Sequence, residues 1–139
     1  VEELNLARLY RDAPVNAIWE GSGNVICLDV LRALEKSPAS AEAFLAELRR
    51  AKGADRRLDA LAESLAHDLS RRPSEREARA LVERMALALE ASLLVRHAPP
   101  VVAEAFCASR LEARAGLYGC LPEGIDEAAL IERATVAAA

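Results

Sequence analysis

Leucines recur at helical spacing in the middle of the chain, and this periodicity constrains the fold more than any other feature of the sequence. Leu58, Leu61, Leu65 and Leu69 lie three or four residues apart, so they share one face of an α-helix. The chain is dominated by Ala, Leu, Glu and Arg, which are strong helix formers, and it has few aromatic or β-branched residues. The sequence therefore predicts an all-α fold.

Residues that start and stop helices divide the chain into about seven helices. We expect the two helices of residues 1–37 to be the end of a larger helical domain, and the five helices of residues 38–139 to form an additional antiparallel bundle. The chain opens with Val1 inside a helical pattern, so we expect a piece of a longer protein. The boundary signals are Pro14, Ser37–Pro38, Gly53, Asp55, Pro73, a capping box over Ser74–Glu77, Pro99–Pro100, Gly116 and Asp126. In particular, helices are expected over 39–52, from 74 to about 98, and from about 101 to 116.

Charge and hydropathy exclude several classes of protein. The formal net charge of −4 gives no general attraction to nucleic acid or to an anionic membrane. No apolar run approaches the roughly 20 residues that span a bilayer, and no signal peptide is recognisable. We therefore expect a cytoplasmic protein that does not act in a membrane.

The cysteines and histidines indicate neither a disulfide framework nor a metal site. Cys27, Cys107 and Cys120 are widely spaced and odd in number, which is typical of free thiols in a reducing compartment. His67 and His97 have no Cys or carboxylate at ligand spacing, so we expect no metal.

The turn within residues 15–24 carries the strongest signal for chemistry. It places Glu20 between Trp19 and Gly21, and a carboxylate in poorly hydrated surroundings has a raised pKa and can accept a proton near neutral pH. The alternative is a carboxylate that caps a helix or pairs with an arginine. Glycines allow another molecule to approach the backbone, and the start of the following helix, capped by Ser22 or Asn24, offers free N–H groups to phosphate or carbonyl oxygens.

Residues 15–34 read Val-Asn-Ala-Ile-Trp-Glu-Gly-Ser-Gly-Asn-Val-Ile-Cys-Leu-Asp-Val-Leu-Arg-Ala-Leu, and this stretch resembles the C-terminal signature of the acyl-CoA dehydrogenases. Most of that family has Tyr-Glu-Gly-Thr where this chain has Trp-Glu-Gly-Ser. The Trp-Glu-Gly-Ser-Gly-Asn form followed by Cys-Leu-Asp-Val-Leu-Arg is similar to the AidB-type branch, the adaptive-response proteins. Weaker similarities at 99–100, 104–107 and 113–116 extend the resemblance over most of the chain.

The resemblance implies a flavoprotein that oxidises acyl-CoA thioesters with FAD, in a homotetramer with the flavin between subunits. A carboxylate base removes the α-proton while the β-hydride passes to the flavin, and Glu20 matches the position of that base. The residues that match the FAD-contacting segment are Ile18, Trp19, Glu20, Gly21, Ser22, Gly23, Asn24 and Leu28. The 139 residues alone should be inactive, because most of both pockets must come from elsewhere.

The AidB-type branch also implies a helical C-terminal domain that binds double-stranded DNA, matched here from about residue 40 onward. One basic segment surrounds Gly53 and a second surrounds Pro73, but cations are favoured at helix ends without any ligand, and no aromatic is interleaved to stack on bases. A DNA-binding or oligomerisation module, and a purely structural bundle that supports the tetramer, are the alternatives to the enzymatic interpretation. The candidate DNA residues are Arg49, Arg50, Arg56 and Arg57 from the first segment, with Arg32 and Arg114 from the resemblance alone; Lys52 completes the first segment, and Arg71, Arg72, Arg76 and Arg79 form the second.

Overall fold

The computed structural model describes residues 5–19, 21–112 and 121–135 of the chain. Within these ranges the secondary structure is helical and contains no strand, so the prediction of an all-α fold is confirmed. In the same ranges no helix is both long and apolar enough to cross a membrane. The elements are α1 (Leu6–Asp12), the 3-10 segment η1 (Ala13–Ala17), α2 (Gly23–Lys36), α3 (Pro38–Arg49), α4 (Arg56–Ser70), α5 (Ala78–His97), α6 (Pro100–Phe106), the π-helical segment η2 (Cys107–Glu112) and α7 (Glu127–Ala134).

Two of the predicted helix starts are capped as the sequence indicates. The Asp55 carboxylate accepts hydrogen bonds from the backbone N–H groups of Arg57 (2.8 Å) and Leu58 (3.3 Å) at the start of α4. The Asp126 carboxylate accepts one from the N–H of Ala129 (3.0 Å) at the start of α7. Each cap satisfies N–H donors that the first turn of a helix leaves without a partner.

The capping box before α5 forms only in part. The Glu77 carboxylate accepts a hydrogen bond from the N–H of Ser74 (2.8 Å), as predicted. The Ser74 hydroxyl, however, donates to the same carboxylate (2.7 Å) and does not accept a backbone N–H. Residues 75–77 therefore form a turn, and α5 begins at Ala78, later than expected.

Two predicted helix ends are wrong in detail, those of the helices expected over 39–52 and from about 101 to 116. Helix α3 ends at Arg49 and not at Lys52, because the following N–H groups of Arg50 and Ala51 bond three residues back and tighten the chain into turns. Gly53, with φ of +83°, does adopt the left-handed conformation expected after this helix. Helix α1 ends at Asp12, two residues before Pro14, as predicted, and the chain continues from Ala13 as the 3-10 segment η1.

The helix expected between residues 101 and 116 also differs. The regular helix α6 ends at Phe106, and the chain continues as η2, in which the Ser109 hydroxyl donates to the carbonyl of Ala105 (2.6 Å). This side chain-to-backbone bond competes with the regular helical ladder. Gly116 lies outside the described residues.

The core lies where α3, α4 and α5 pack together, with α6 and η2 against α4 and α5. Leu58 and Leu65 are 1% and 0% exposed, and Leu61 and Leu69 pack at the edge of the same cluster, as the leucine periodicity predicts. Helix α2 packs against α5 and α3. The proposed domain boundary at residues 37–38 therefore falls between two helices that touch, and it stays a prediction.

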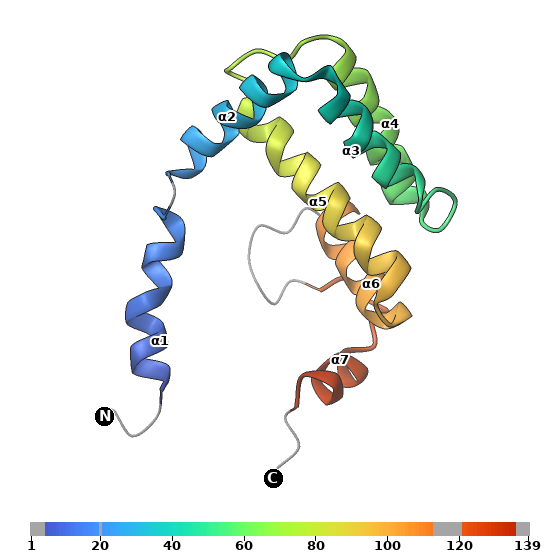
Figure 1. The fold of residues 1–139 in the computed structure, drawn as a ribbon. Coiled ribbons are helices and arrows are strands. Elements are labelled where there is room, and N and C mark those ends of the chain that lie inside the picture. Colours follow the sequence, from blue (N-terminus) through green and yellow to red (C-terminus); the bar gives the residue numbers. More distant parts are fainter. Residues whose placement is uncertain (1–4, 20, 113–120, 136–139) are drawn as a thin grey trace.

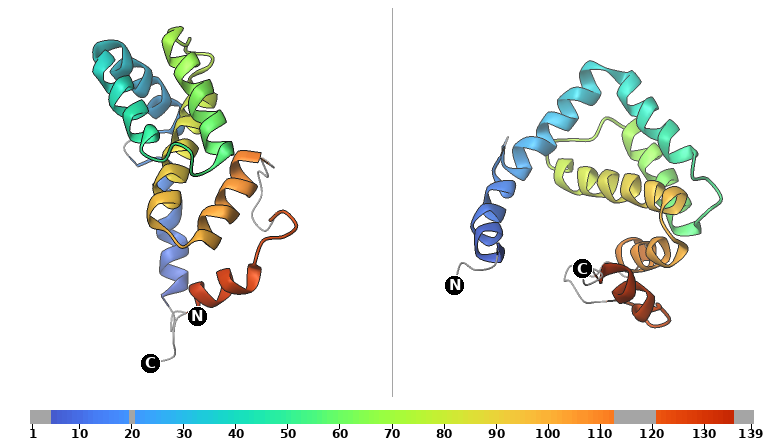
Figure 2. Two further views of the ribbon diagram at one scale, coloured as in Figure 1. Left: turned by 90° about the vertical axis from the view of Figure 1, so that its right-hand side faces the viewer. Right: turned by 60° about the horizontal axis from the view of Figure 1, so that its bottom comes forward.

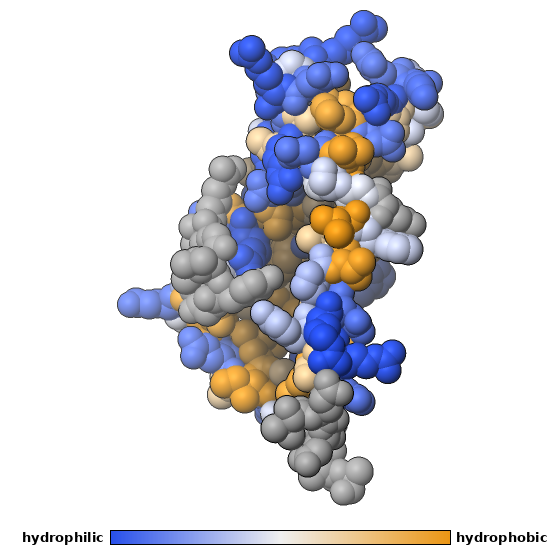
Figure 3. Space-filling model, turned by 90° about the vertical axis from the view of Figure 1, so that its left-hand side faces the viewer, coloured by the Kyte–Doolittle hydropathy of each residue, from blue (hydrophilic) through white to orange (hydrophobic). Residues whose placement is uncertain are grey.

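Helix α1 stands apart from this core (Figures 1 and 2). It packs against η1, and none of its residues is buried; Leu6, Leu9 and Tyr10 are 69%, 60% and 80% exposed. Figure 3, which views the molecule from the side of α1, shows apolar patches on this face. At the other end of the chain, α7 packs on α6 and is likewise without a buried residue.

Candidate functional site

The candidate turn connects η1 to α2 and is held by its own backbone. The N–H groups of Ile18 and Trp19 both donate to the carbonyl of Val15, at 3.0 and 2.7 Å, and the N–H of Gly21 donates to the carbonyl of Ile18 at 3.2 Å. Gly21 has φ of +121°, which a residue with a side chain adopts only under strain. The glycine after Glu20 is therefore required by the shape of the turn.

The side chains on this turn face outward. Ile18 is 69% exposed and Trp19 is 68% exposed, so the indole is not packed into the chain's own core. Within the described residues, therefore, the chain leaves most of Trp19 uncovered, and the expected poor hydration of the neighbouring carboxylate stays a prediction. Glu20 lies outside the described residues, and its role stays a prediction.

The start of α2 lacks the expected side-chain cap. Ser22 occupies the N-cap position with extended backbone angles, but among the described residues no side chain accepts a bond from the first turn. The first helical bond runs from the N–H of Ile26 to the carbonyl of Ser22 (3.1 Å). Among the residues that the structure describes, no side chain competes with a ligand oxygen for the N-terminal N–H groups of α2.

Asn24, the other predicted cap, is used differently. Its side-chain oxygen accepts a hydrogen bond from the guanidinium of Arg79, at 3.0 Å, in the first turn of α5. Gly23 makes room for this contact, since a Cβ there would lie 2.6 Å from a terminal nitrogen of Arg79. Sequence reasoning missed Arg79 as a neighbour of the turn, because 55 residues separate it from Asn24.

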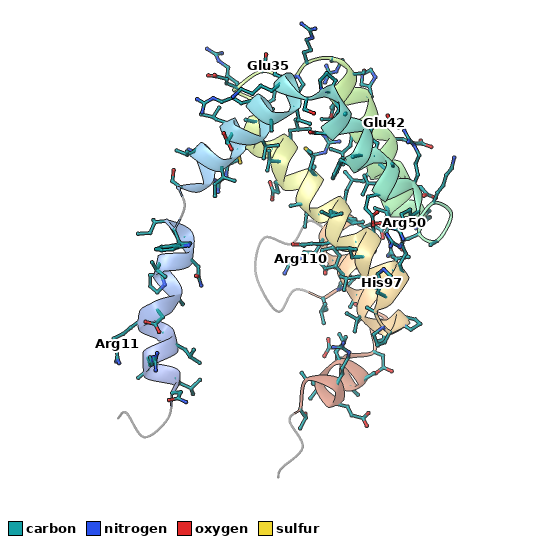
Figure 4. The ribbon with its side chains drawn as sticks, in the orientation of Figure 1. Arg11, Glu35, Glu42, Arg50, His97 and Arg110 are labelled. Carbon is teal, nitrogen blue, oxygen red and sulfur yellow. The ribbon has the colours of Figure 1, made fainter. Side chains whose placement is uncertain are left out.

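Leu28 lies one turn further along α2 and is half-buried. It lines a hollow of about 520 Å³ at the corner where α2 meets α3 and where the chain passes from α4 to α5. Arg32, Glu35 and Arg72 line the same hollow; Figure 4 labels Glu35 near the end of α2. Leu28 therefore lies at this corner, one turn of α2 beyond the candidate turn.

Comparison with known proteins identifies a relative. The chain is 39% identical over 116 residues to the protein named "Putative acyl-CoA dehydrogenase AidB" of Escherichia coli (strain K12). The chain is therefore similar in sequence to part of an AidB-type acyl-CoA dehydrogenase. The match covers 84% of the chain, and the chain spans 21% of the length of that relative. No protein-family model matches.

The arginines that the AidB-type resemblance offered for DNA are mostly engaged by carboxylates. Arg49, the last residue of α3, pairs with Glu42 at 2.7 Å, and Arg50, directly after α3, pairs with Glu47 at 2.9 Å; Figure 4 labels Glu42 on α3 and Arg50 at the end of this helix. The hydrogen bond from Arg49 lowers the pKa of Glu42, which keeps that carboxylate charged. The arginines of the first basic segment thus lie beside carboxylates.

Arg56 and Arg57, two further candidates for DNA contact, also lie beside carboxylates. Arg56 lies 3.6 Å from Glu112 in η2. Arg57 is only 14% exposed at its side chain and binds Asp55 at 2.6 Å and Glu104 at 2.7 Å. Within the described ranges Arg32 forms no ion pair, and Arg114 lies outside the described residues.

The Arg57 contacts form the main electrostatic cluster of the described chain. The hydrogen bond from Arg57 lowers the pKa of both Asp55 and Glu104. Beside them the buried thiol of Cys107 has a pKa raised to about 11, mainly by burial and next by the charge of Asp55. The cluster joins α4 to α6 and η2, so it holds these helices together.

Cysteines and histidines form no metal site in the parts of the chain that the structure describes, where no group of three or more His, Cys, Asp or Glu side chains comes together. Cys27 and Cys107 are free and buried, as expected of thiols in the core. Cys120 lies outside the described residues.

Proposed function

We propose that this chain is a segment of an FAD-dependent, AidB-type flavoprotein of the cytoplasm, which removes hydrogen from acyl-CoA thioesters as a homotetramer. The observation that carries the proposal is the turn at residues 18–24, where an exposed isoleucine and tryptophan precede a glycine turn and an uncapped helix start. The identity of 39% to an AidB protein supports it. Because the chain spans 21% of that relative, most of the flavin and thioester pockets would come from residues outside it.

The residues of the turn fit a flavin. Ile18 and Trp19 offer exposed apolar surface for a flat ring, and Gly21 and Gly23 add no side chain that would keep a ring from the backbone. Ser22, Asn24 and the first N–H groups of α2 offer donors for carbonyl or phosphate oxygens. When bound, the flavin supplies the acceptor for the hydride that leaves the β-carbon of the thioester.

Glu20 is the residue we assign to take the α-proton. A carboxylate performs this step near neutral pH when water is excluded from it, because desolvation disfavours its charged form. Trp19 and Ile18 are exposed in this chain, so we expect the exclusion of water to come from the remainder of the flavoprotein and from the bound thioester.

The absorbance spectrum of the full-length protein tests this proposal. We expect a bound flavin whose visible absorbance bleaches on anaerobic addition of at least one acyl-CoA from a panel of chain lengths. The 139-residue chain, purified alone, should retain no flavin. A full-length protein that takes up no FAD on reconstitution, or a 139-residue chain that binds FAD tightly, would contradict it.

One observation favours a second function, the binding of duplex DNA by the AidB-type C-terminal helices. Arg32 and Arg72 line one hollow, and among the described residues neither has an ion-pair partner, in contrast to Arg49 and Arg50. DNA affinity that falls steeply with salt and is lost on replacing Arg32 and Arg72 by alanine, but not on replacing Arg49 and Arg50, would support it. Absence of binding to a duplex at low salt would exclude it.

A further inference from the structure

A contact between α5 and α2 reaches the candidate turn. Arg79 donates to the side-chain oxygen of Asn24 at 3.0 Å. At Gly23 an added Cβ would lie 2.6, 3.4 and 3.6 Å from three atoms of the same guanidinium. The guanidinium therefore lies against the first two residues of α2, directly after the Gly21–Ser22 turn.

The position of Arg79 is not explained by α5 itself. Arg79 is the second residue of that helix, and the positive end of the helix dipole disfavours a cation there. Arg76 adds a further positive charge three residues earlier. The partner that the structure supplies to the exposed Arg79 side chain outside α5 is Asn24.

The hydrogen bond from Arg79 to Asn24 takes the place of a cap that Asn24 could form at the start of its own helix. An asparagine near a helix start commonly caps its own backbone, yet the Asn24 side-chain oxygen accepts from Arg79 while the first turn of α2 stays uncapped. The start of α2 is thus tied to another helix and not to itself. Further along, α2 packs against α5, and Cys27 of α2 is buried.

We propose that Arg79 is a positioning residue, which fixes the start of α2 and thereby sets the geometry of the turn at residues 18–24. With respect to the flavin, this inference rests on the proposed function. It means that the helices after residue 38 help to shape the flavin-facing turn and are not an independent appendage.

Hydrogen exchange on the 139-residue chain tests the positioning without any flavin. In Arg79→Ala, the N–H of Ile26, which forms the first bond of α2, should exchange about three to ten times faster, the range expected for loss of one such hydrogen bond. Amides of α4 should keep their rates. Arg79→Lys should restore part of the protection, since an ammonium can still donate to Asn24, and Arg76→Ala should have no effect. Unchanged exchange at Ile26 in Arg79→Ala, or an equal effect of Arg76→Ala, would overturn the proposal.

Gly23→Ala gives a second test that leaves Arg79 in place. Alanine favours helix over glycine, so α2 alone should become more stable, whereas the new Cβ would lie 2.6 Å from a terminal nitrogen of Arg79 and requires the guanidinium to shift from its place beside Asn24. We expect faster exchange at Gly21 and Ile26 in spite of the better helix former. Slower exchange at both amides would contradict the positioning role.

A separate experiment on the full-length protein tests whether Arg79 affects flavin binding. There Arg79→Ala should lower flavin retention and shift the visible spectrum of the bound flavin, Arg79→Lys should recover both in part, and Arg76→Ala should match the wild type. A wild-type protein without flavin would refute the proposed function. The hydrogen exchange of Ile26 would then decide by itself whether Arg79 positions the start of α2. A wild-type protein with flavin whose retention and spectrum Arg79→Ala does not alter would overturn the inference alone.

Discussion

Arg57 in the first turn of α4 donates hydrogen bonds to both carboxylate oxygens of Glu104 in α6, at 3.0 and 2.7 Å. The same guanidinium binds Asp55, which caps α4, so one side chain joins a helix cap to a helix 47 residues away. Such bidentate geometry is specific to arginine.

Replacing Arg57 by alanine should destabilise the chain by about 2 kcal/mol, because it leaves the largely buried Asp55 carboxylate without its partner. Arg57→Lys should lose about half of this, since an ammonium cannot form the paired bonds. Urea unfolding followed by circular dichroism measures both. The matched control is Arg49→Ala, whose pair with Glu42 is exposed and should cost less than about 0.5 kcal/mol; equal losses for Arg57 and Arg49 would show that burial of the cluster contributes nothing.

Stability should fall in acid, and Asp55 should account for part of the fall. Its pKa is lowered in the folded chain, mainly by Arg57, so its contribution is present above the ordinary aspartate value of about 3.9 and is lost as the pH falls through the lower folded value. Between pH 5 and pH 3 the urea midpoint of the wild type should therefore drop more than that of Asp55→Asn. Parallel pH profiles for the two proteins would refute this assignment.

The Cys107 thiol should be inert in the native chain. It is fully buried and its pKa is raised to about 11, so almost no thiolate is present at pH 8. Peptide mapping after treatment with iodoacetamide should find Cys107 unmodified without denaturant and fully modified in urea. Modification of Cys107 in the native chain at the rate of a free thiol would show that η2 opens readily.

Truncation of Leu65 should lower the free energy of unfolding more than truncation of most other residues. It is 0% exposed and lies at the centre of the leucine face of α4, so Leu65→Ala should destabilise the chain by about 3 kcal/mol. Leu93→Ala is the control, because Leu93 in α5 is 43% exposed and should cost less than about 1 kcal/mol. A larger loss at Leu93 than at Leu65 would mean that the predicted core is misplaced.

The features that could be predicted from sequence are the local ones. The helical class, the buried face with Leu58 and Leu65, and the caps at Asp55 and Asp126 all depend on residues within a few positions of one another. The capping box predicted at Ser74 forms only in part, because the Ser74 hydroxyl donates to the nearby Glu77 carboxylate.

The features that could not be predicted are set by packing between distant helices. The Asn24 side chain was expected to cap its own helix, but Arg79 reaches it from α5. Arg57 was one of the candidates for DNA contact, and its ion pair with Glu104 of α6 was not predictable from sequence. The exposure of Trp19 likewise depends on what the rest of a protein places against it, and a residue's own neighbours in sequence do not specify that surface.

The comparison of wild type with Glu20→Gln in the full-length flavoprotein tests the central claim most directly. The two side chains are nearly isosteric, but the amide cannot accept the α-proton. With an acyl-CoA that bleaches the wild-type flavin under anaerobic conditions, we predict that Glu20→Gln retains its flavin and shows no bleaching, or bleaching slowed at least about a thousandfold. Bleaching of Glu20→Gln at the wild-type rate would contradict the assignment of Glu20 as the base.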